Sequence, residues 1–225
     1  MKKDTALEFL FFSYFRIDFQ DANNKNKLIE AAIERAYIDA SNHVLQLKKD
    51  NVLNEKQILM IRKKCKKDGE HAIKKALERQ ATVEDVYEII KKIYNSSGLT
   101  MTLGITQKWY NMTIKYLFVM NAILNDVGNT VLEELCHKFA GRIDVPVDDN
   151  IIRVACDMSV EVPCRNKDNT YSGMKEIYSN KIPWSQWDQI SYYHAFQKNI
   201  KDKLDNENIL DEENRIWISV AKKDK

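Results

Sequence analysis

Two apolar patterns with different repeats meet in the segment Pro146-Val147-Asp148-Asp149-Asn150-Ile151-Ile152-Arg153-Val154-Ala155. The run before it, residues 143–147, is typical of an extended strand, whereas Asp148 to Met158 repeats at helical spacing. Asp148 therefore stands where a helix begins, and a carboxylate there accepts backbone N–H groups and is stabilised by the helix dipole. A helix cap is one interpretation of Asp148, and the acidic group of an active site is the other.

The composition of the 225-residue chain favours a helical globular protein. Hydrophobic residues make up 44% and charged residues 30%, which is enough apolar surface to build a core. The 6 Gly and 3 Pro are too few for the many turns of a sandwich or barrel. Because no Gly-, Ser- or Pro-rich linker divides the chain, we expect one all-α unit over residues 1–225 with two helical lobes.

Hydrophobic periodicity assigns most of the chain to helices. The expected helices are residues 27–49, a helix capped by Asn54, 83–94 after a Thr82–Asp85 capping signal, a helix capped by Thr106, 129–139, 148–158, and a long one from Ser185 or Trp187 to Ile200. Residues 166–180 predict a loop, and residues 214–220 predict a short strand or an extended arm.

Charge and cysteine content limit the kinds of partner and site. With 35 basic and 33 acidic residues the net charge is +2, so any nucleic-acid binding must come from a local patch. The lysine runs at 63–67, 74–75 and 91–92 are candidates for such a patch, and solvated helix faces are the alternative. The cysteines and histidines lack zinc-ligand spacing, which predicts no metal and the reduced thiols of a cytoplasmic protein. The apolar segment 9–15 is too short to span a bilayer and favours contact with the core or a partner.

A second segment, Gly104-Ile105-Thr106-Gln107-Lys108, predicts a tight turn followed by a helix with a lysine in its first turn. The helix dipole disfavours a positive charge at that position. Surface exposure, a nucleophilic amine or a phosphate bound over the helix start would each explain Lys108. Lys115 lies two turns further along the same helix face, so either lysine can be the nucleophile.

Together the two segments resemble the helix-hairpin-helix DNA glycosylases, which include endonuclease III and the 8-oxoguanine glycosylases. Residues 104–108 are similar to that family's hairpin and following helix, which carries the lysine nucleophile of the bifunctional members. Val147-Asp148-x-x-Ile151-x-Arg153-Val154-Ala155 is similar to the segment that carries its catalytic aspartate, and residues 145–148 resemble the 8-oxoguanine branch in particular. The resemblance covers about residues 82–160, which implies a hairpin lobe there and a second lobe from the N- and C-terminal helices.

The resemblance implies a DNA glycosylase, with or without an AP-lyase step, that acts on a damaged or modified base in double-stranded DNA. It implies Lys108 as the nucleophile, Asp148 as the stabilising carboxylate, and no cofactor. The residues implied to hold DNA phosphates are Gly104, Ile105, Thr106 and Gln107, and candidates for the base pocket are Trp109, Tyr110, Trp184 and Trp187. Core packing is the alternative for these aromatic residues.

We expect a monomer that does not associate with a membrane. Two other functions fit the sequence: a non-catalytic helix-hairpin-helix DNA-binding protein, and an all-α protein-interaction module. The first would bind DNA without needing Lys108 or Asp148, and the second would not bind DNA.

Overall fold

The structure is a computed structural model that describes residues 3–41, 54–167, 170–204 and 209–223. It is mostly helical, which confirms the predicted all-α class. The helices are α1 (Lys3–Leu10), α2 (Lys25–Ser41), α3 (Glu55–Arg79), α4 (Val83–Asn95), α5 (Leu103–Asn125), α6 (Glu133–Phe139), α7 (Asp149–Asp157), α8 (Ile190–Lys203) and α9 (Ile209–Lys223). Short helical segments are η1 (Phe11–Phe15), η2 (Phe19–Asn23), η3 (Tyr178–Asn180) and η4 (Trp184–Gln186), and one hairpin pairs β1 (Val162–Arg165) with β2 (Tyr171–Lys175).

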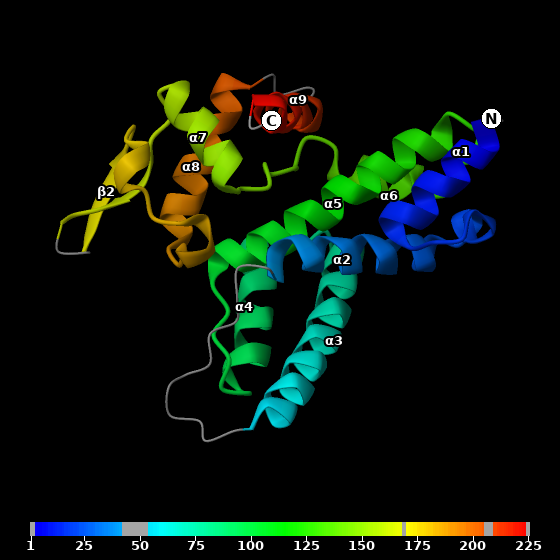
Figure 1. The fold of residues 1–225 in the computed structure, drawn as a ribbon, viewed down its shortest axis with the longest axis horizontal. Helices are drawn as coiled ribbons and strands as arrows, with labels where there is room; N and C mark the ends of the chain where they lie inside the picture. The colour runs from blue at the N-terminus through cyan, green and yellow to red at the C-terminus, as the bar shows by residue number, and fades with distance from the viewer. Residues whose placement is uncertain (1–2, 42–53, 168–169, 205–208, 224–225) are drawn as a thin grey trace.

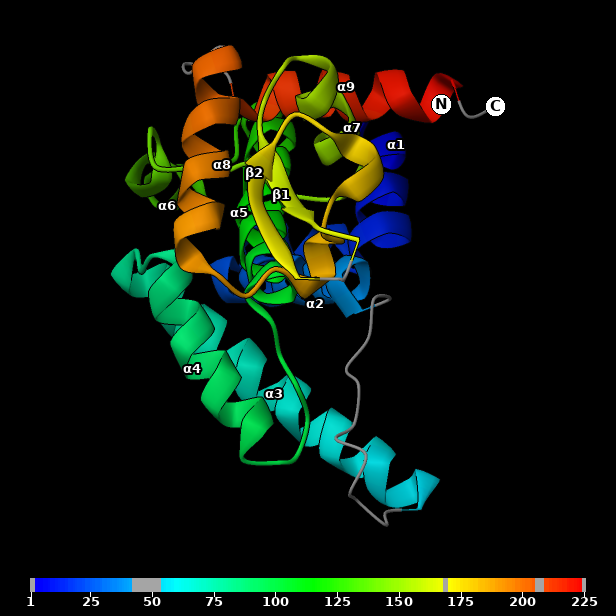
Figure 2. The same cartoon turned by 90° about the vertical axis from the view of Figure 1, so that its left-hand side faces the viewer.

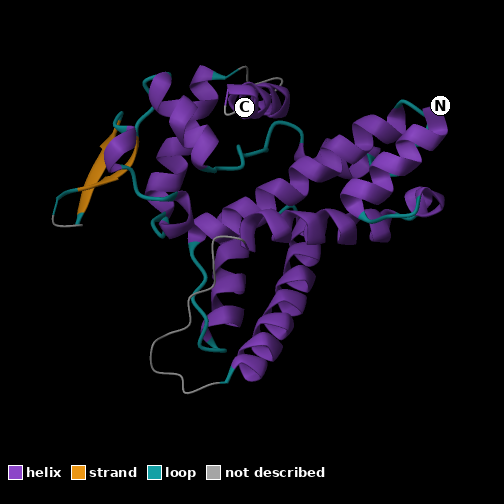
Figure 3. Ribbon diagram, viewed as in Figure 1, coloured by secondary structure: helices purple, strands orange, loops and turns teal. Residues whose placement is uncertain are grey.

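Helix α5 is the centre of the molecule. It is buried from Leu103 to Leu117, and these buried positions include polar residues such as Gln107 and Lys115 as well as apolar ones. Helix α2 packs along α5, and the two form a middle layer (Figure 1). Helices α3 and α4 extend from one side of this layer, and α7, α8 and α9 cover the other side (Figures 1 and 2). The hairpin lies at the edge, beyond α8 (Figure 3).

Helix starts with local capping signals lie where the sequence predicts them. Asn54 caps α3 and forms a capping box with Gln57. Thr82 caps α4 and forms the same box with Asp85. Asp148 caps α7. In each case the cap and its partner are close in the sequence, so the signal does not depend on tertiary contacts.

Several predicted elements differ from the structure. Residues 214–220 belong to α9 and not to a strand or arm, and the predicted loop at 166–180 contains β2. The helix predicted at 129–139 begins only at Glu133, and α8 begins only at Ile190. The predicted helix over 27–49 is α2 as far as Ser41, and its remaining residues lie outside the described part of the chain.

Candidate functional site

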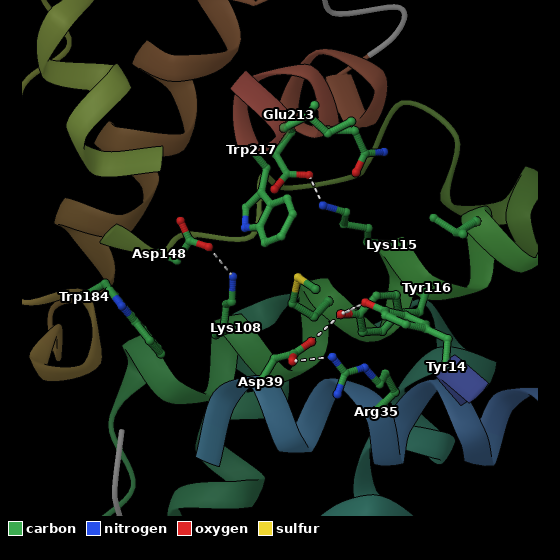
Figure 4. A pocket seen from close by; sticks show the side chains of 14 residues that line it. Tyr14, Arg35, Asp39, Lys108, Lys115, Tyr116, Asp148, Trp184, Glu213 and Trp217 are labelled. Atoms are coloured by element: carbon green, nitrogen blue, oxygen red, sulfur yellow. Dashed lines mark hydrogen bonds and ion pairs between the residues drawn. The ribbon is translucent and has the colours of Figure 1, made fainter. Parts of the chain in front are cut away.

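A pocket of about 550 Å³ opens between the middle layer and α9 (Figure 4). Helix α5 lines it with Lys108, Met112, Lys115 and Val119, whose spacing returns each side chain to one face of the helix. Both candidate lysines therefore point into the same pocket. The other lining residues are Tyr14, Arg35, Asp39, Tyr116, Asp148, Trp184, Glu213, Asn214, Trp217 and Ile218.

Lys108 and Asp148 are in direct contact in this pocket. Lys108 Nζ donates to Asp148 Oδ2 at 2.8 Å, and the two side chains are 7% and 16% exposed. Asp148 Oδ1 accepts the backbone N–H of Ile151 at 3.0 Å. One carboxylate therefore both caps α7 and pairs with the lysine, so the cap holds the carboxylate at the pocket wall.

Two buried glutamines hold the extended segment in front of Asp148. Gln107 Oε1 accepts the N–H of Val147 at 3.1 Å, and its Nε2 donates to the Val147 carbonyl at 3.0 Å. Gln197 pairs with Val145 in the same way, at 2.9 Å and 2.8 Å. These side-chain amides take the place of a neighbouring strand. Because Gln107 precedes Lys108 and Val147 precedes Asp148, the Gln107 bonds fix the lysine and the carboxylate relative to one another.

A second lysine–carboxylate pair lies in the same pocket. The Lys115 amine contacts the carboxylate of Glu213, which α9 carries and which is 1% exposed. Burial raises the pKa of Glu213, and the positive charge of Lys115 only partly offsets this. Helix α9 is therefore anchored over the pocket by an ion pair that is almost wholly removed from water.

The wall opposite Asp148 carries a third ion pair and two phenols. Arg35 pairs with Asp39 at 3.1 Å. The Tyr116 hydroxyl donates to Asp39, and the Tyr14 hydroxyl donates to Tyr116 at 3.0 Å. Burial and the hydrogen bond to Asp39 raise the pKa of Tyr116. Three cationic and three anionic side chains line the pocket, so its charges balance.

The predicted tight turn at residues 104–107 is part of α5. Thr102, and not Thr106, caps this helix, and its Oγ1 accepts the N–H of Ile105 at 3.2 Å. Thr106 instead donates its hydroxyl to the Thr102 carbonyl at 3.0 Å. Lys108 consequently lies in the second turn of α5, where the helix dipole opposes a positive charge less strongly than at the first.

The structure does not support phosphate binding by Gly104, Ile105, Thr106 and Gln107. All four residues are buried. The Gly104 N–H donates to the Trp187 carbonyl at 2.9 Å, and the next two N–H groups donate to Thr102. A Cβ atom at Gly104 would lie 1.7 Å from the Trp184 carbonyl oxygen, so the glycine permits close packing and not a turn. The helix-hairpin-helix motif is thus not confirmed.

Of the four aromatic residues predicted for a base pocket, Trp184 lines the pocket and the other three do not. Trp109 is fully buried and donates its indole N–H to the Ile33 carbonyl at 3.0 Å. Tyr110 donates to the Ala81 carbonyl at 2.9 Å, and Trp187 donates to the Ile182 carbonyl at 3.0 Å. These three are core residues whose polar atoms are satisfied internally.

The sequence predicted Lys108, Lys115, Asp148 and Trp184 for the site but not the other lining residues, among them Tyr14, Asp39, Glu213 and Trp217. Two of them, Glu213 and Trp217, come from α9, whose buried positions Ile209, Glu213 and Val220 follow helical spacing. This spacing predicts a helix at α9 if an acidic residue is accepted at one of the buried positions. Tyr14 and Asp39 carry no such signal, because their roles depend on contacts with Tyr116 on another helix.

The predicted lysine patches lie mainly on α3, on the side of the middle layer away from α9 (Figure 1). Lys66 pairs with Glu34 at 3.1 Å, and Lys74 pairs with Glu30 at 2.7 Å. Lys63 and Lys64 are exposed. The runs therefore combine solvated positions with ion pairs that dock α3 on α2.

Within the described residues, no helix combines the length and apolar character that a membrane span requires. The same part of the chain holds no cluster of three or more His, Cys, Asp or Glu side chains arranged for a metal ion. Comparison of the chain with models of protein families, with curated proteins and with solved structures finds no match.

Proposed function

We propose that the pocket is the active site of a DNA glycosylase with an AP-lyase step, which removes a damaged or modified base. The observation that carries the proposal is the 2.8 Å contact between Lys108 Nζ and Asp148 Oδ2 at the wall of an open pocket. An amine nucleophile beside a fixed carboxylate is the pair of groups that this chemistry requires.

In the proposed reaction the target nucleotide leaves the base stack and enters the pocket. The Asp148 carboxylate stabilises the positive charge that develops on the sugar as the base departs. The Lys108 side chain attacks C1′ as the neutral amine while the bond from C1′ to the base breaks. Asp148 then accepts the proton that the bonded nitrogen releases and passes it to the ring oxygen, whose bond to C1′ breaks as the Schiff base forms; strand cleavage follows from this Schiff base.

The lining of the pocket suits an uncharged base and sugar. Its three ion pairs balance one another, so it has no excess positive charge to hold a phosphate. Its volume of about 550 Å³ lies within the range of small-molecule sites. Trp184 and Trp217 supply aromatic side chains at the wall, which can stack on a base. In this arrangement the phosphates stay outside the pocket.

The enzymatic function is favoured over a non-catalytic hairpin protein. That alternative needs the N–H groups of residues 104–107 to be free for phosphates, yet those of Gly104, Ile105 and Thr106 donate within the protein. The interaction-module alternative is compatible with the exposed Phe9, Leu10 and Phe12. An interaction module would not act on DNA, so substitution of Lys108 would change neither base excision nor covalent trapping. The trapping experiment described next therefore separates this alternative from the proposed function.

Borohydride trapping tests the proposal. The protein is incubated with duplex oligonucleotides that carry a panel of damaged or modified bases, and with a duplex that carries an abasic site. We expect a covalent complex with the wild type, none with Lys108→Gln, and a strongly reduced yield with Asp148→Asn. Lys66→Gln is the matched control, because Lys66 is also ion-paired but lies outside the pocket. Absence of excision and trapping on every substrate would refute the proposal.

A further inference from the structure

The Lys115–Glu213 pair shares the pocket with the Lys108–Asp148 pair but is separate from it. Lys115 lies on the same face of α5 as Lys108, two turns further along. In Figure 4 each lysine points toward its own carboxylate, and Trp217 lies between the two pairs. The pocket therefore presents two amine–carboxylate pairs, one held by the α7 cap and one held by α9.

The reaction proposed above requires a second proton transfer. When the bond between C1′ and the base breaks, its electron pair leaves with the base nitrogen, and a neutral base departs more easily if it receives a proton. Asp148 has no proton to give to the base. Its Oδ1 caps α7, and its Oδ2 accepts from Lys108 and takes the proton of that lysine during the reaction.

Among the described lining residues, the other proton donors paired with a carboxylate are Arg35 and Tyr116, both on Asp39, and Lys115 on Glu213. Arg35 does not release its proton, and the pKa of Tyr116 is raised by burial and by its hydrogen bond to Asp39, so Lys115 is the candidate acid.

We infer that Lys115 donates this proton to the departing base and that Glu213 positions Lys115 for the transfer; the inference rests on the proposed glycosylase function. In the complete step the Lys108 amine gives its lone pair to C1′ while the base leaves with the electron pair of the broken bond. The proton from Lys115 goes to the base, the proton of Lys108 goes to Asp148, and the Lys115–Glu213 pair is left with one negative charge.

The surroundings of Glu213 fit this role. The charged groups that face it are Lys115 and Lys108 on α5 and Asp148 before α7. Across the pocket stand Arg35 and Asp39, which pair with each other, and the phenols Tyr14 and Tyr116. Because burial raises the pKa of Glu213, its carboxylate holds a shared proton more firmly than an exposed one would. The Lys115–Glu213 pair therefore retains a proton at the pocket wall when Lys108 has lost its proton.

Two substrates separate this role from the role of Lys108. One is a duplex whose base the wild type excises, and the other is a duplex with a pre-formed abasic site, which has no base to protonate. For Lys115→Gln and Glu213→Gln we expect base excision to fall by about 100-fold or more, the usual contribution of a general acid. Borohydride trapping at the abasic site should stay at the wild-type rate.

A leaving-group series gives the sharper readout. Oligonucleotides carry the excised base with ring substituents that progressively lower the pKa of its leaving nitrogen. The defect of Lys115→Gln should shrink along this series, because a better leaving group needs less protonation. The double variant Lys115→Met/Glu213→Leu removes both buried charges together, so no buried charge is left unpaired. It should show the same pattern, and it keeps the test possible if either single variant fails to fold.

Three outcomes would overturn the inference. Loss of trapping at the abasic site in a folded Lys115 variant would make Lys115 the nucleophile. An excision defect that stays constant along the leaving-group series would give the pair a purely structural role. If the wild-type protein neither excises a base nor forms a trapped complex, the proposed function is wrong, and the inference about Lys115 is wrong with it. The wild-type measurements alone reveal this outcome, so it is distinguishable from a failure of the Lys115 role.

Discussion

Removal of the Gln107 side chain should both destabilise the protein and separate the two groups of the proposed site. Gln107 is fully buried, and its amide satisfies both the N–H and the carbonyl of Val147. Gln107→Ala leaves two buried backbone groups without partners, and at about 1–3 kcal/mol each the loss is about 2–6 kcal/mol. That is a large part of the total stability of about 5–15 kcal/mol that proteins of this kind have.

Gln197→Ala is the matched control for this change. Gln197 makes the same two bonds to Val145, two residues further from Asp148, and is also buried. Both variants should lower the midpoint of urea unfolding by about 1–3 M, given a slope of about 2 kcal/mol per M. Only Gln107→Ala should reduce borohydride trapping beyond the reduction that its unfolded fraction explains, because Gln107, unlike Gln197, joins the neighbour of Lys108 to the neighbour of Asp148.

Either of two results would contradict this role of Gln107. An unchanged urea midpoint for Gln107→Ala would mean that its two hydrogen bonds do not hold the extended segment. Equal trapping by both variants, after correction for the folded fraction, would mean that the position of Asp148 does not depend on Gln107.

Two further predictions concern packing and pH. Gly104→Ala should destabilise the protein by about 3 kcal/mol or more, measured by thermal unfolding, because its Cβ would overlap the Trp184 carbonyl; an unchanged transition would contradict the close approach. Burial alone would raise the pKa of Asp149, but hydrogen bonds from Lys181 and Tyr178 outweigh it and lower the pKa below the usual 3.8. Asp149 should therefore stabilise the fold above that value and lose this contribution as the pH falls through its lowered pKa. Asp149→Asn should flatten the acid limb of a stability–pH curve between about pH 2 and 5, and an unchanged limb would refute this.

Local signals in the sequence predicted the helix starts at Asn54, Thr82 and Asp148. Each cap bonds to a residue three positions ahead, so the sequence contains both partners. The turn predicted at Gly104 was wrong for the opposite reason, because the contact that requires this glycine is distant in the sequence. It is conformationally ordinary within α5, and what requires it is the Trp184 backbone 80 residues away in the sequence. Nothing near Gly104 in the chain signals that contact.

Helix α9 shows why part of the site could not be predicted. Its buried face includes Glu213, and an acidic residue at a core position breaks the apolar pattern by which helices are recognised. The run Ile216-Trp217-Ile218 then resembles a strand. Glu213 is buried because Lys115 is there to pair with it, 98 residues earlier in the chain. By contrast, Asp148 had a correct helix-start signal of its own, and the structure brings it into contact with Lys108.

The identity of the trapped residue shows whether Lys108 is the nucleophile. The wild-type protein is trapped with borohydride on a duplex that carries an abasic site, digested, and analysed by mass spectrometry of its peptides. We expect one adduct, on Lys108, which disappears in Lys108→Gln and persists in Lys66→Gln. An adduct on Lys115 or on a lysine outside the pocket, or no adduct at all, would contradict this role of Lys108.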